Sequence, residues 1–200
     1  MPSLWADNLD EHRALVLGRL LDAYESLRAE VGVDGVTLAA VAQRAGLARS
    51  AVYNYVEDKH DLILAHAERT MAGAVERLRQ ALDAVDAPEA QLRTYVAMSL
   101  RMHASETGAG DDLMPMLTPA EQGRLFAMLD PIRELLAEIV ADGVDQGVFT
   151  AGPADQLTGV VWAVLSGYRM PVAAGHVDPD AAAGAVTTVL LNGLTGPSPR

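Results

Sequence analysis

The side chains best suited to bind another molecule by hydrogen bonds lie in one short polar stretch. Residues 48–55 have the apolar spacing of a short helix with Val52 directed inward. Groups on the outer side of such a helix can donate to base edges or phosphates in the major groove of DNA. The stretch therefore predicts a nucleic-acid contact surface. Its outer side carries a guanidinium, a hydroxyl, a phenol and an amide, on Arg49, Ser50, Tyr53 and Asn54.

The segment before this stretch supplies the first half of a helix-turn-helix. Thr37 suits the N-cap position, because its hydroxyl can accept from a free backbone N–H of the helix that follows. Small residues at Ala39, Ala42 and Ala45 allow two helices to cross closely, and Gly46 permits a sharp turn. A short helix, a Gly-containing turn and a second short helix are the anatomy of this motif.

The charge balance is the main observation against nucleic-acid binding. The net charge is −12, and residues 1–70 alone hold 7 basic against 11 acidic side chains. Proteins that coat nucleic acid without sequence preference are usually basic, so that class is disfavoured. A sequence-specific binder needs only a local basic surface, which Arg44, Arg49 and Lys59 could form on one face. The acidic side chains expected to point away from that face are Asp22, Glu25, Glu30 and Asp34.

Residues 37–63 resemble the TetR family of bacterial regulators. The family pattern consists of a capping Thr, a helix of small residues, Ala-Gly-aliphatic and a short polar helix with Leu-Tyr, followed by further aromatics, Lys and a pair of aliphatics. The preceding helix, residues 10–31, agrees with the family as well. This chain matches the pattern at Thr37, Leu38, Ala42, Ala45, Gly46, Leu47, Val52, Tyr53, Tyr55, Lys59, Leu62 and Ile63.

The resemblance implies a role for each polar residue of the motif. Thr37 would cap its helix and touch a phosphate. Lys59 would hold a phosphate with help from the dipole of the helix that begins beside it. Tyr53 suits a half-buried core position equally well, so both roles stay open for it. The remaining implied contacts are with bases for Arg49, Ser50 and Asn54, and with the DNA backbone for Tyr53 and Tyr55.

Three positions depart from the family pattern. Ala48 and Ala51 lack hydroxyls that the family usually has there, so the second helix loses its usual cap and one phosphate contact. Val56 replaces a Phe and is a smaller core side chain. Together with the acidic charge balance, these departures favour an alternative hypothesis. In that alternative the chain is an all-α small-molecule-binding or scaffolding protein with a degenerate DNA-binding domain.

Helical spacing continues through almost the whole chain, which predicts an all-α fold of about nine helices. A capped start with Pro at the first helical position is expected at residues 118–121. We expect a DNA-binding domain at 1–58, a ligand-binding and dimerisation domain at 59–196 and a frayed tail at 197–200. The first long helix is expected to bury one stripe, made of Leu17, Leu20, Leu21, Tyr24, Leu27 and Val31.

The resemblance also implies a small-molecule pocket among the helices of the second domain. Methionine is flexible and polarisable, so the methionines of this region could line an adaptable apolar cavity. The expected ligand is a neutral or weakly polar hydrophobic molecule. The same methionines also suit the filling of gaps in an ordinary core, and that alternative stays open. The candidate lining residues are Tyr95, Met98, Met102, His103, Met116, Met128, Trp162 and Tyr168.

The last two long helices are rich in Ala, Gly and Val and carry few charges. Small residues allow close helix packing, including packing across a two-fold axis. The resemblance implies a homodimer through residues 154–194, built as a four-helix bundle, whereas the residues alone also suit packing within one chain. One small-residue surface holds Val160, Ala163, Val164 and Gly167, and another holds Ala182, Ala185, Val186, Val189 and Gly193.

These expectations combine into one mechanism. Two recognition helices about 34–36 Å apart would bind a near-palindromic DNA operator. A ligand would change that separation, and repression is the commoner outcome in the family. The chain has no Cys, no phosphate-binding Gly loop and no His pair at i and i+4, so we expect no enzyme, cofactor or metal site. No stretch approaches the roughly 20 apolar residues of a membrane span and no secretory signal is visible, so a cytoplasmic location is expected.

Overall fold

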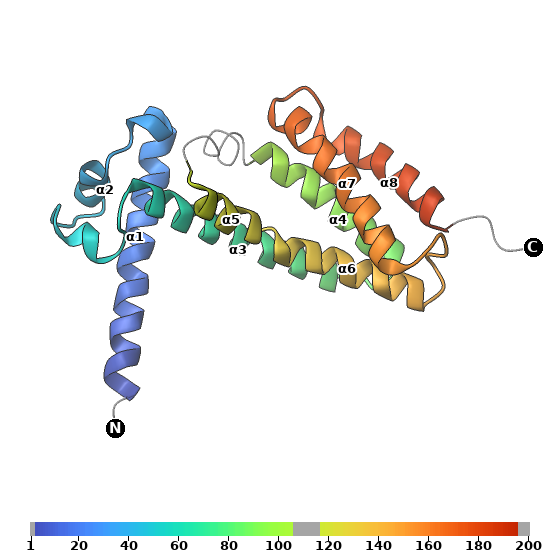
Figure 1. Cartoon of the computed structure of the whole chain (residues 1–200), viewed down its shortest axis with the longest axis horizontal. Coiled ribbons are helices and arrows are strands. Elements are labelled where there is room, and N and C mark those ends of the chain that lie inside the picture. Colours follow the sequence, from blue (N-terminus) through green and yellow to red (C-terminus); the bar gives the residue numbers. More distant parts are fainter. Residues whose placement is uncertain (1–2, 106–116, 196–200) are drawn as a thin grey trace, which may run out of the picture. The chain divides into compact units, whose positions relative to one another are not determined.

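The computed structural model is helical throughout the residues it describes, which are 3–105 and 117–195 (Figure 1). The predicted all-α class is confirmed, and these ranges contain no strand. Against the expected total of nine, they hold eight α-helices and one short 3-10 helix. The elements are α1 (Ser3–Gly35), α2 (Leu38–Arg44), η1 (Ala51–Asn54), α3 (Lys59–Asp83), α4 (Pro88–Ser105), α5 (Pro119–Ala127), α6 (Asp130–Asp145), α7 (Ala154–Ala173) and α8 (Pro179–Thr195).

The chain forms two compact units, which we call the head (residues 1–70) and the body (residues 71–200). The division falls inside α3, after Thr70, so this helix contributes to both units. The domain boundary expected after Asp58 lies directly before α3 begins. The expected tail at 197–200 lies outside the described residues.

The apolar stripe of α1 forms the centre of the head. Leu20, Leu21, Tyr24 and Leu27 are buried as predicted, and Leu17 is half-buried. The expectation for Val31 is wrong, since its side chain is 54% exposed. Val31 directly precedes Gly32, where φ is +73° and the helix is kinked, so the stripe loses its direction at this point. The helix given as residues 10–31 therefore does not end at Gly32: it is kinked there, and a helical turn resumes to Gly35.

The body is built around α4, which packs against α6, α7 and α8 (Figure 1). A single apolar core fills the space between these helices, and the second half of α3 contributes to it through residues such as Leu78 and Leu82. Tyr95, Leu100 and Leu136 are each fully buried in this core. Close packing of large apolar side chains of this kind is the main source of stability in a helical domain.

The expected capped start at residues 118–121 is confirmed. The Thr118 hydroxyl accepts from the Glu121 N–H, and the Glu121 carboxylate accepts from the Thr118 N–H at 2.7 Å, which is a complete capping box. Pro119 occupies the first turn of α5 as predicted. None of the described helices has the length and hydropathy needed to cross a lipid bilayer.

Candidate nucleic-acid interface

The first helix of the motif is fixed at its N-terminal end by the predicted cap. Thr37 is extended, with φ −121° and ψ 148°, and its Oγ1 accepts from the Ala40 N–H at 3.2 Å. This hydrogen bond satisfies one of the free donors at the start of α2. Val41 and Ala42 point into the head core with no exposed surface. The predicted cap is therefore present, and Val41 and Ala42 form the buried face of α2.

The turn after α2 depends on Gly46. Its φ is +70°, a left-handed conformation that glycine adopts without a steric penalty. A Cβ atom at this position would also lie 3.1 Å from the guanidinium of Arg19. The Leu47 N–H donates to the Ala42 carbonyl at 2.8 Å, a hydrogen bond that satisfies one of the free carbonyls at the end of α2. This turn connects α2 to residues 48–55, which we call the recognition segment.

The recognition segment is shorter and more tightly wound than predicted. A helix was expected over 48–55, but only Ala51–Asn54 is helical, and it is a 3-10 helix. The Ser50 side chain makes no capping hydrogen bond at its start. This agrees with the absence of hydroxyls at Ala48 and Ala51, since no side chain here satisfies the first donors. Val52 is the one fully buried side chain of the segment and holds it against the head, as predicted.

The polar side chains of the recognition segment face solvent. Arg49, Ser50 and Asn54 are exposed, and Tyr53 is 56% exposed. Tyr55 is half-buried. Arg49 forms no hydrogen bond or ion pair with the described part of the chain. The head thus presents a guanidinium, a hydroxyl, a phenol and an amide on one short segment with a buried anchor.

Lys59 stands at the first residue of α3, as expected, but its ammonium is already engaged. Nζ donates to the carbonyl oxygen of Asp34 at 3.2 Å. The Asp58 carboxylate caps the N-terminus of α3, because it accepts a hydrogen bond from the Asp61 N–H at 2.9 Å. The contact with Asp34 joins the start of α3 to the end of α1.

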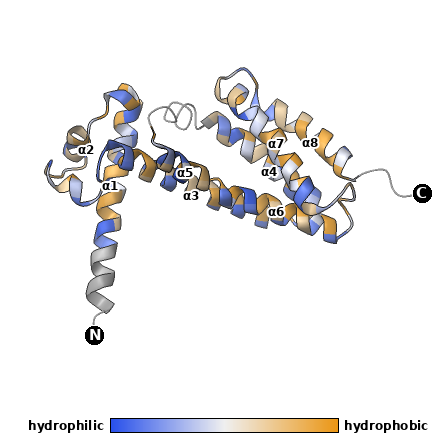
Figure 2. Ribbon diagram, viewed as in Figure 1, coloured by the Kyte–Doolittle hydropathy of each residue, from blue (hydrophilic) through white to orange (hydrophobic). Residues whose placement is uncertain are grey.

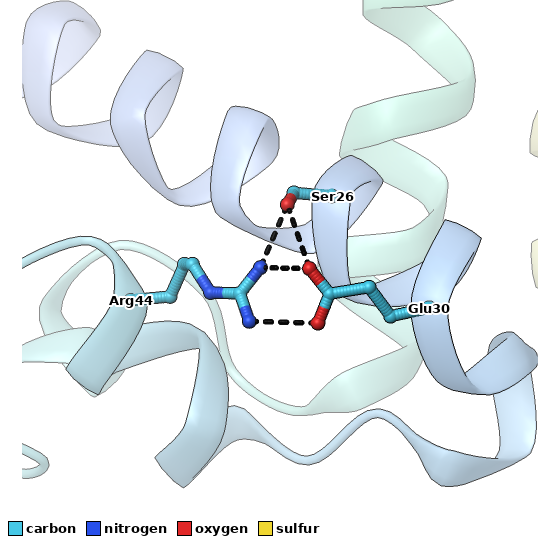
Figure 3. A network of polar contacts seen from close by, with 3 residues as sticks. All are labelled: Ser26, Glu30 and Arg44. Atoms are coloured by element: carbon cyan, nitrogen blue, oxygen red, sulfur yellow. Dashed lines mark hydrogen bonds and ion pairs between the residues drawn. The ribbon is translucent and has the colours of Figure 1, made fainter.

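The guanidinium of Arg44, unlike that of Arg49, is paired within the head, although its side chain is 38% exposed. Figure 3 shows its guanidinium facing the carboxylate of Glu30 on α1 in a two-pronged ion pair, with Nη1–Oε1 2.6 Å and Nη2–Oε2 2.8 Å. Arg44 Nη1 also donates to Ser26 Oγ at 2.7 Å. The pKa of Glu30 is lowered, mainly by its hydrogen bonds with Arg44. The pair is therefore ionised at neutral pH.

The acidic residues of α1 are not all turned away from the basic ones. That expectation is wrong for Glu30, which contacts Arg44 directly. Asp22 lies 2.7 Å and Glu25 3.7 Å from the guanidinium of Arg69 on α3. Packing of α1 against α2 and α3 places opposite charges side by side across the helix crossings, and these charges attract. The head is acidic by count, and three of its carboxylates, those of Asp22, Glu25 and Glu30, are paired with arginines of the head.

Arg19 is a structural residue that the sequence pattern did not single out. Its guanidinium donates to the carbonyl of Ala45, the C-cap residue of α2. A basic group near the last carbonyls of a helix also complements the helix dipole. The position of Arg19 in the sequence does not predict this contact, because Arg19 and Ala45 are 26 positions apart and meet only through tertiary packing.

Two family profiles match this chain. Residues 20–66 match the bacterial regulatory proteins of the tetR family, and residues 88–190 match the tetracyclin repressor-like C-terminal domain. The chain belongs to the TetR family. The predicted family is therefore confirmed, as is the function of this TetR-family chain as a DNA-binding transcriptional regulator.

Individual relatives agree with this membership. A helix-turn-helix-type transcriptional regulator of Mycobacterium tuberculosis is 31% identical over 151 residues, which is 76% of this chain and 69% of the relative. The fold resembles that of FadR, a fatty acid degradation regulator from Bacillus halodurans, with a TM-score of 0.71 at 20% identity, over 89% of this chain and 95% of FadR. FadR from Bacillus subtilis, solved in complex with stearoyl-CoA, gives a TM-score of 0.69 at 16% identity, over 88% and 97% of the two chains.

The body of this TetR-family regulator brings most of the candidate ligand residues to one core. Tyr95 is fully buried and donates from its hydroxyl to the Ile132 carbonyl at 3.0 Å. Burial raises the pKa of Tyr95, so its hydroxyl is protonated at neutral pH. His103 and Met128 are half-buried, and Met116 lies outside the described residues. The half-buried residues packed against the same core are Met98, Met102, Trp162 and Tyr168.

The two small-residue surfaces of α7 and α8 have different surroundings. Ala182 and Val186 are buried within the chain, so for these two residues the alternative of packing within one chain holds. Residues one turn away on α8 remain outside, and Val189 is 71% exposed. Figure 2 shows hydrophobic colouring along much of α8, whose exposed residues include Val189 and the polar Thr188 and Asn192. The exposed members of the two predicted surfaces are Val160, Ala163, Gly167, Ala185, Val189 and Gly193.

Proposed function

We propose that this TetR-family regulator is a repressor that binds a near-palindromic operator as a homodimer and is released from it by a small hydrophobic molecule. The observation that carries the proposal is the recognition segment. Its single buried anchor, Val52, leaves the polar side chains of the segment exposed to solvent. A rigidly attached, polar surface segment after a helix-turn is what major-groove recognition requires.

In this proposal the recognition segment divides its contacts between bases and backbone. Arg49, Ser50 and Asn54 contact base edges, since guanidinium, hydroxyl and amide groups match the donor and acceptor pattern of the major groove. Thr37, Tyr53, Tyr55 and Lys59 contact the phosphate backbone. Lys59 has three donors, of which the Asp34 carbonyl uses one, so two remain for a phosphate.

The effector is proposed to bind in the body. Support comes from the cluster of Tyr95, Met98 and Met102 with two further aromatic side chains in one core. Ser99 Oγ is buried in the same helix beside the Tyr95 side chain, so the two hydroxyls together could bind a weakly polar group of a ligand. The likeness to FadR with its bound stearoyl-CoA supports a ligand with a large apolar part. His103, Met116, Met128, Trp162 and Tyr168 complete the proposed lining.

The homodimer is proposed to form through residues 154–194. The exposed apolar and small residues of α7 and α8 support it, because an isologous interface needs a flat, self-complementary surface on each subunit. Val160 and Val189 are 55% and 71% exposed in the single chain, and burial of such side chains on association is favourable. The dimer would place two recognition segments roughly 34–36 Å apart on one side of the duplex.

Selection of bound sequences from random DNA, with the full-length protein, tests this function. We expect a near-palindromic sequence whose half-sites are about one helical turn apart, or a multiple of it. Arg49→Ala and Asn54→Ala should each relax the preference at one base position, at a cost of about 1–3 kcal/mol for the preferred base. Arg79→Ala, an exposed arginine of the body, is the matched control and should bind like the unaltered protein.

Two results would contradict the proposal. One is the absence of any enriched sequence, which would favour a ligand-binding or scaffolding protein with a degenerate head. The other is tight binding to random DNA at physiological salt, because an acidic protein should have low non-specific affinity. A subsequent screen of apolar compounds for release of the selected operator tests the effector class.

A further inference from the structure

Arg44 and Arg19 run in opposite directions between the same two helices. Arg44, the last residue of α2, reaches Glu30 and Ser26 on α1. Arg19, on α1, reaches the Ala45 carbonyl, which directly follows Arg44 in the chain. Both contacts therefore hold the same turn of α2, immediately before the Gly46 turn that leads into the recognition segment. We use the name arginine clamp for the five residues in these contacts, which are Arg19, Ser26, Glu30, Arg44 and Ala45.

The helix α2 and the 3-10 helix that follows it are too short to fix their own orientation. A helix of seven residues such as α2 is marginal in isolation, and its position depends on tertiary contacts. The 3-10 helix that follows has four residues and one fully buried side chain, Val52. Contacts at the end of α2 thus set the direction in which the chain enters the recognition segment.

We propose that Arg44 is a positioning residue for DNA recognition and not a DNA ligand, and that it acts through Glu30 and Ser26. Its guanidinium makes three hydrogen bonds inside the head, two of them to one carboxylate. Two-pronged arginine–carboxylate pairs fix relative orientation as well as distance. The clamp holds the last turn of α2 on α1, so that Arg49, Ser50 and Asn54 are presented at a constant angle. This inference rests on the proposed function.

The two roles of Arg44 predict opposite effects for its partner. If Arg44 positions α2, loss of the Glu30 carboxylate weakens operator binding, because the clamp opens. If Arg44 binds a phosphate, Glu30 competes with the phosphate for the same guanidinium, and loss of its carboxylate strengthens binding. Removal of any acidic charge from the head also favours DNA in general. Whether loss of the Glu30 carboxylate weakens or strengthens operator binding therefore distinguishes the two roles of Arg44.

The test compares Glu30→Gln, Arg44→Gln, the double variant and Asp34→Asn in binding to the selected operator over a range of salt concentrations. Asp34→Asn is the matched control, since it removes one exposed acidic charge a helical turn from Glu30 without touching Arg44. We expect Glu30→Gln and Arg44→Gln each to weaken binding about fivefold relative to Asp34→Asn, as for a well-formed surface ion pair. The double variant should lose no more than either single one.

The salt dependence provides an independent readout. A lost phosphate contact reduces the slope of log K against log salt by about 0.9, whereas a lost positioning contact leaves the slope unchanged. The exchanged pair Glu30→Arg with Arg44→Glu should restore most of the affinity. Amide hydrogen exchange over residues 45–54 should accelerate in both single variants and not in Asp34→Asn.

Several results would overturn the proposal. They are tighter binding by Glu30→Gln than by Asp34→Asn, a reduced salt slope in Arg44→Gln, or unchanged hydrogen exchange in both single variants. Failure of the proposed function looks different, because the unaltered protein would then bind no selected DNA sequence at all. In that case the hydrogen-exchange comparison still shows whether the clamp positions the segment.

Discussion

The head and the body are stabilised by different kinds of contact. The head adds to its small apolar core a set of ion pairs between α1 and its neighbours, such as Arg44–Glu30 and Arg69–Asp22. The body depends on a large apolar core in which Leu78, Tyr95 and Leu136 have no exposed surface. Exposed ion pairs are individually weak and are screened by salt, whereas apolar burial is not. The geometry of the head should therefore respond to solution conditions that leave the body unchanged.

The largest expected effect concerns the core of the body. The ring of Phe149 is buried against Gly143, where an added Cβ would lie 2.1 Å from a ring atom. Phe149→Ala should lower the free energy of unfolding by about 3–5 kcal/mol, from lost burial and the cavity left behind. Phe126→Ala is the matched control, since Phe126 is 53% exposed, and it should change stability by about 0.5 kcal/mol or less. Urea denaturation measures both, and equal losses would contradict this account of the body.

The next effect compares two exposed apolar side chains, one in each unit. Val189 in the body is 71% exposed and Leu15 in the head is 69% exposed. Val189→Arg should weaken the proposed dimer about a hundredfold or more, because the two-fold axis brings an unpaired charge from each subunit into the interface. Leu15→Arg should leave the dimer intact. Sedimentation equilibrium distinguishes the two, and a dimer that tolerates Val189→Arg would place the interface elsewhere.

A smaller effect is expected at the cap of α2. Thr37→Ala removes the hydroxyl that accepts from the Ala40 N–H and should destabilise α2 by about 1 kcal/mol. Thr37→Ser keeps the hydroxyl and should retain most of the stability. Hydrogen exchange of residues 38–44 should accelerate in Thr37→Ala while amides of the body are unaffected. Acceleration in both units would mean that the head does not unfold locally.

The smallest effect is a pH dependence confined to the head. His66 packs edge-on against Tyr24, with ring centroids 5.0 Å apart, and burial lowers its pKa below the ordinary value of 6.5. Glu25 opposes this shift, which limits its size. The unfolded chain then binds a proton that the folded head binds less readily, so stability falls as the pH decreases below about 6.5 and is constant above it.

His66→Gln isolates this contribution. Unfolding followed at several pH values should show a shallower loss of stability between about pH 6.5 and 5 in the variant than in the unaltered protein. His12→Gln, which changes an exposed histidine, is the control and should keep the full dependence. A steeper loss in His66→Gln would mean that the folded head favours the protonated imidazole.

The sequence predicted those features that depend on neighbours along the chain. Helical spacing predicted the helices, and local hydrogen bonding predicted the caps at Thr37 and Thr118. It did not predict the Arg44–Glu30 pair, because the two residues are 14 positions apart and meet only where α1 and α2 cross. It also could not separate Val186 from Val189. Both belong to the same predicted small-residue surface of α8, and only packing decides which of the two side chains faces the core.

The position of the clamp within the chain limits how the binding specificity of this protein can be re-engineered. A graft of residues 45–58 from a relative would replace the recognition segment and leave Glu30 and Arg44 as they are. A graft that begins at residue 38 would exchange Arg44 without its partner. Chimeric regulators built at the first junction should therefore inherit a new operator preference together with a correctly oriented segment, whereas those built at the second should need residue 30 from the same donor.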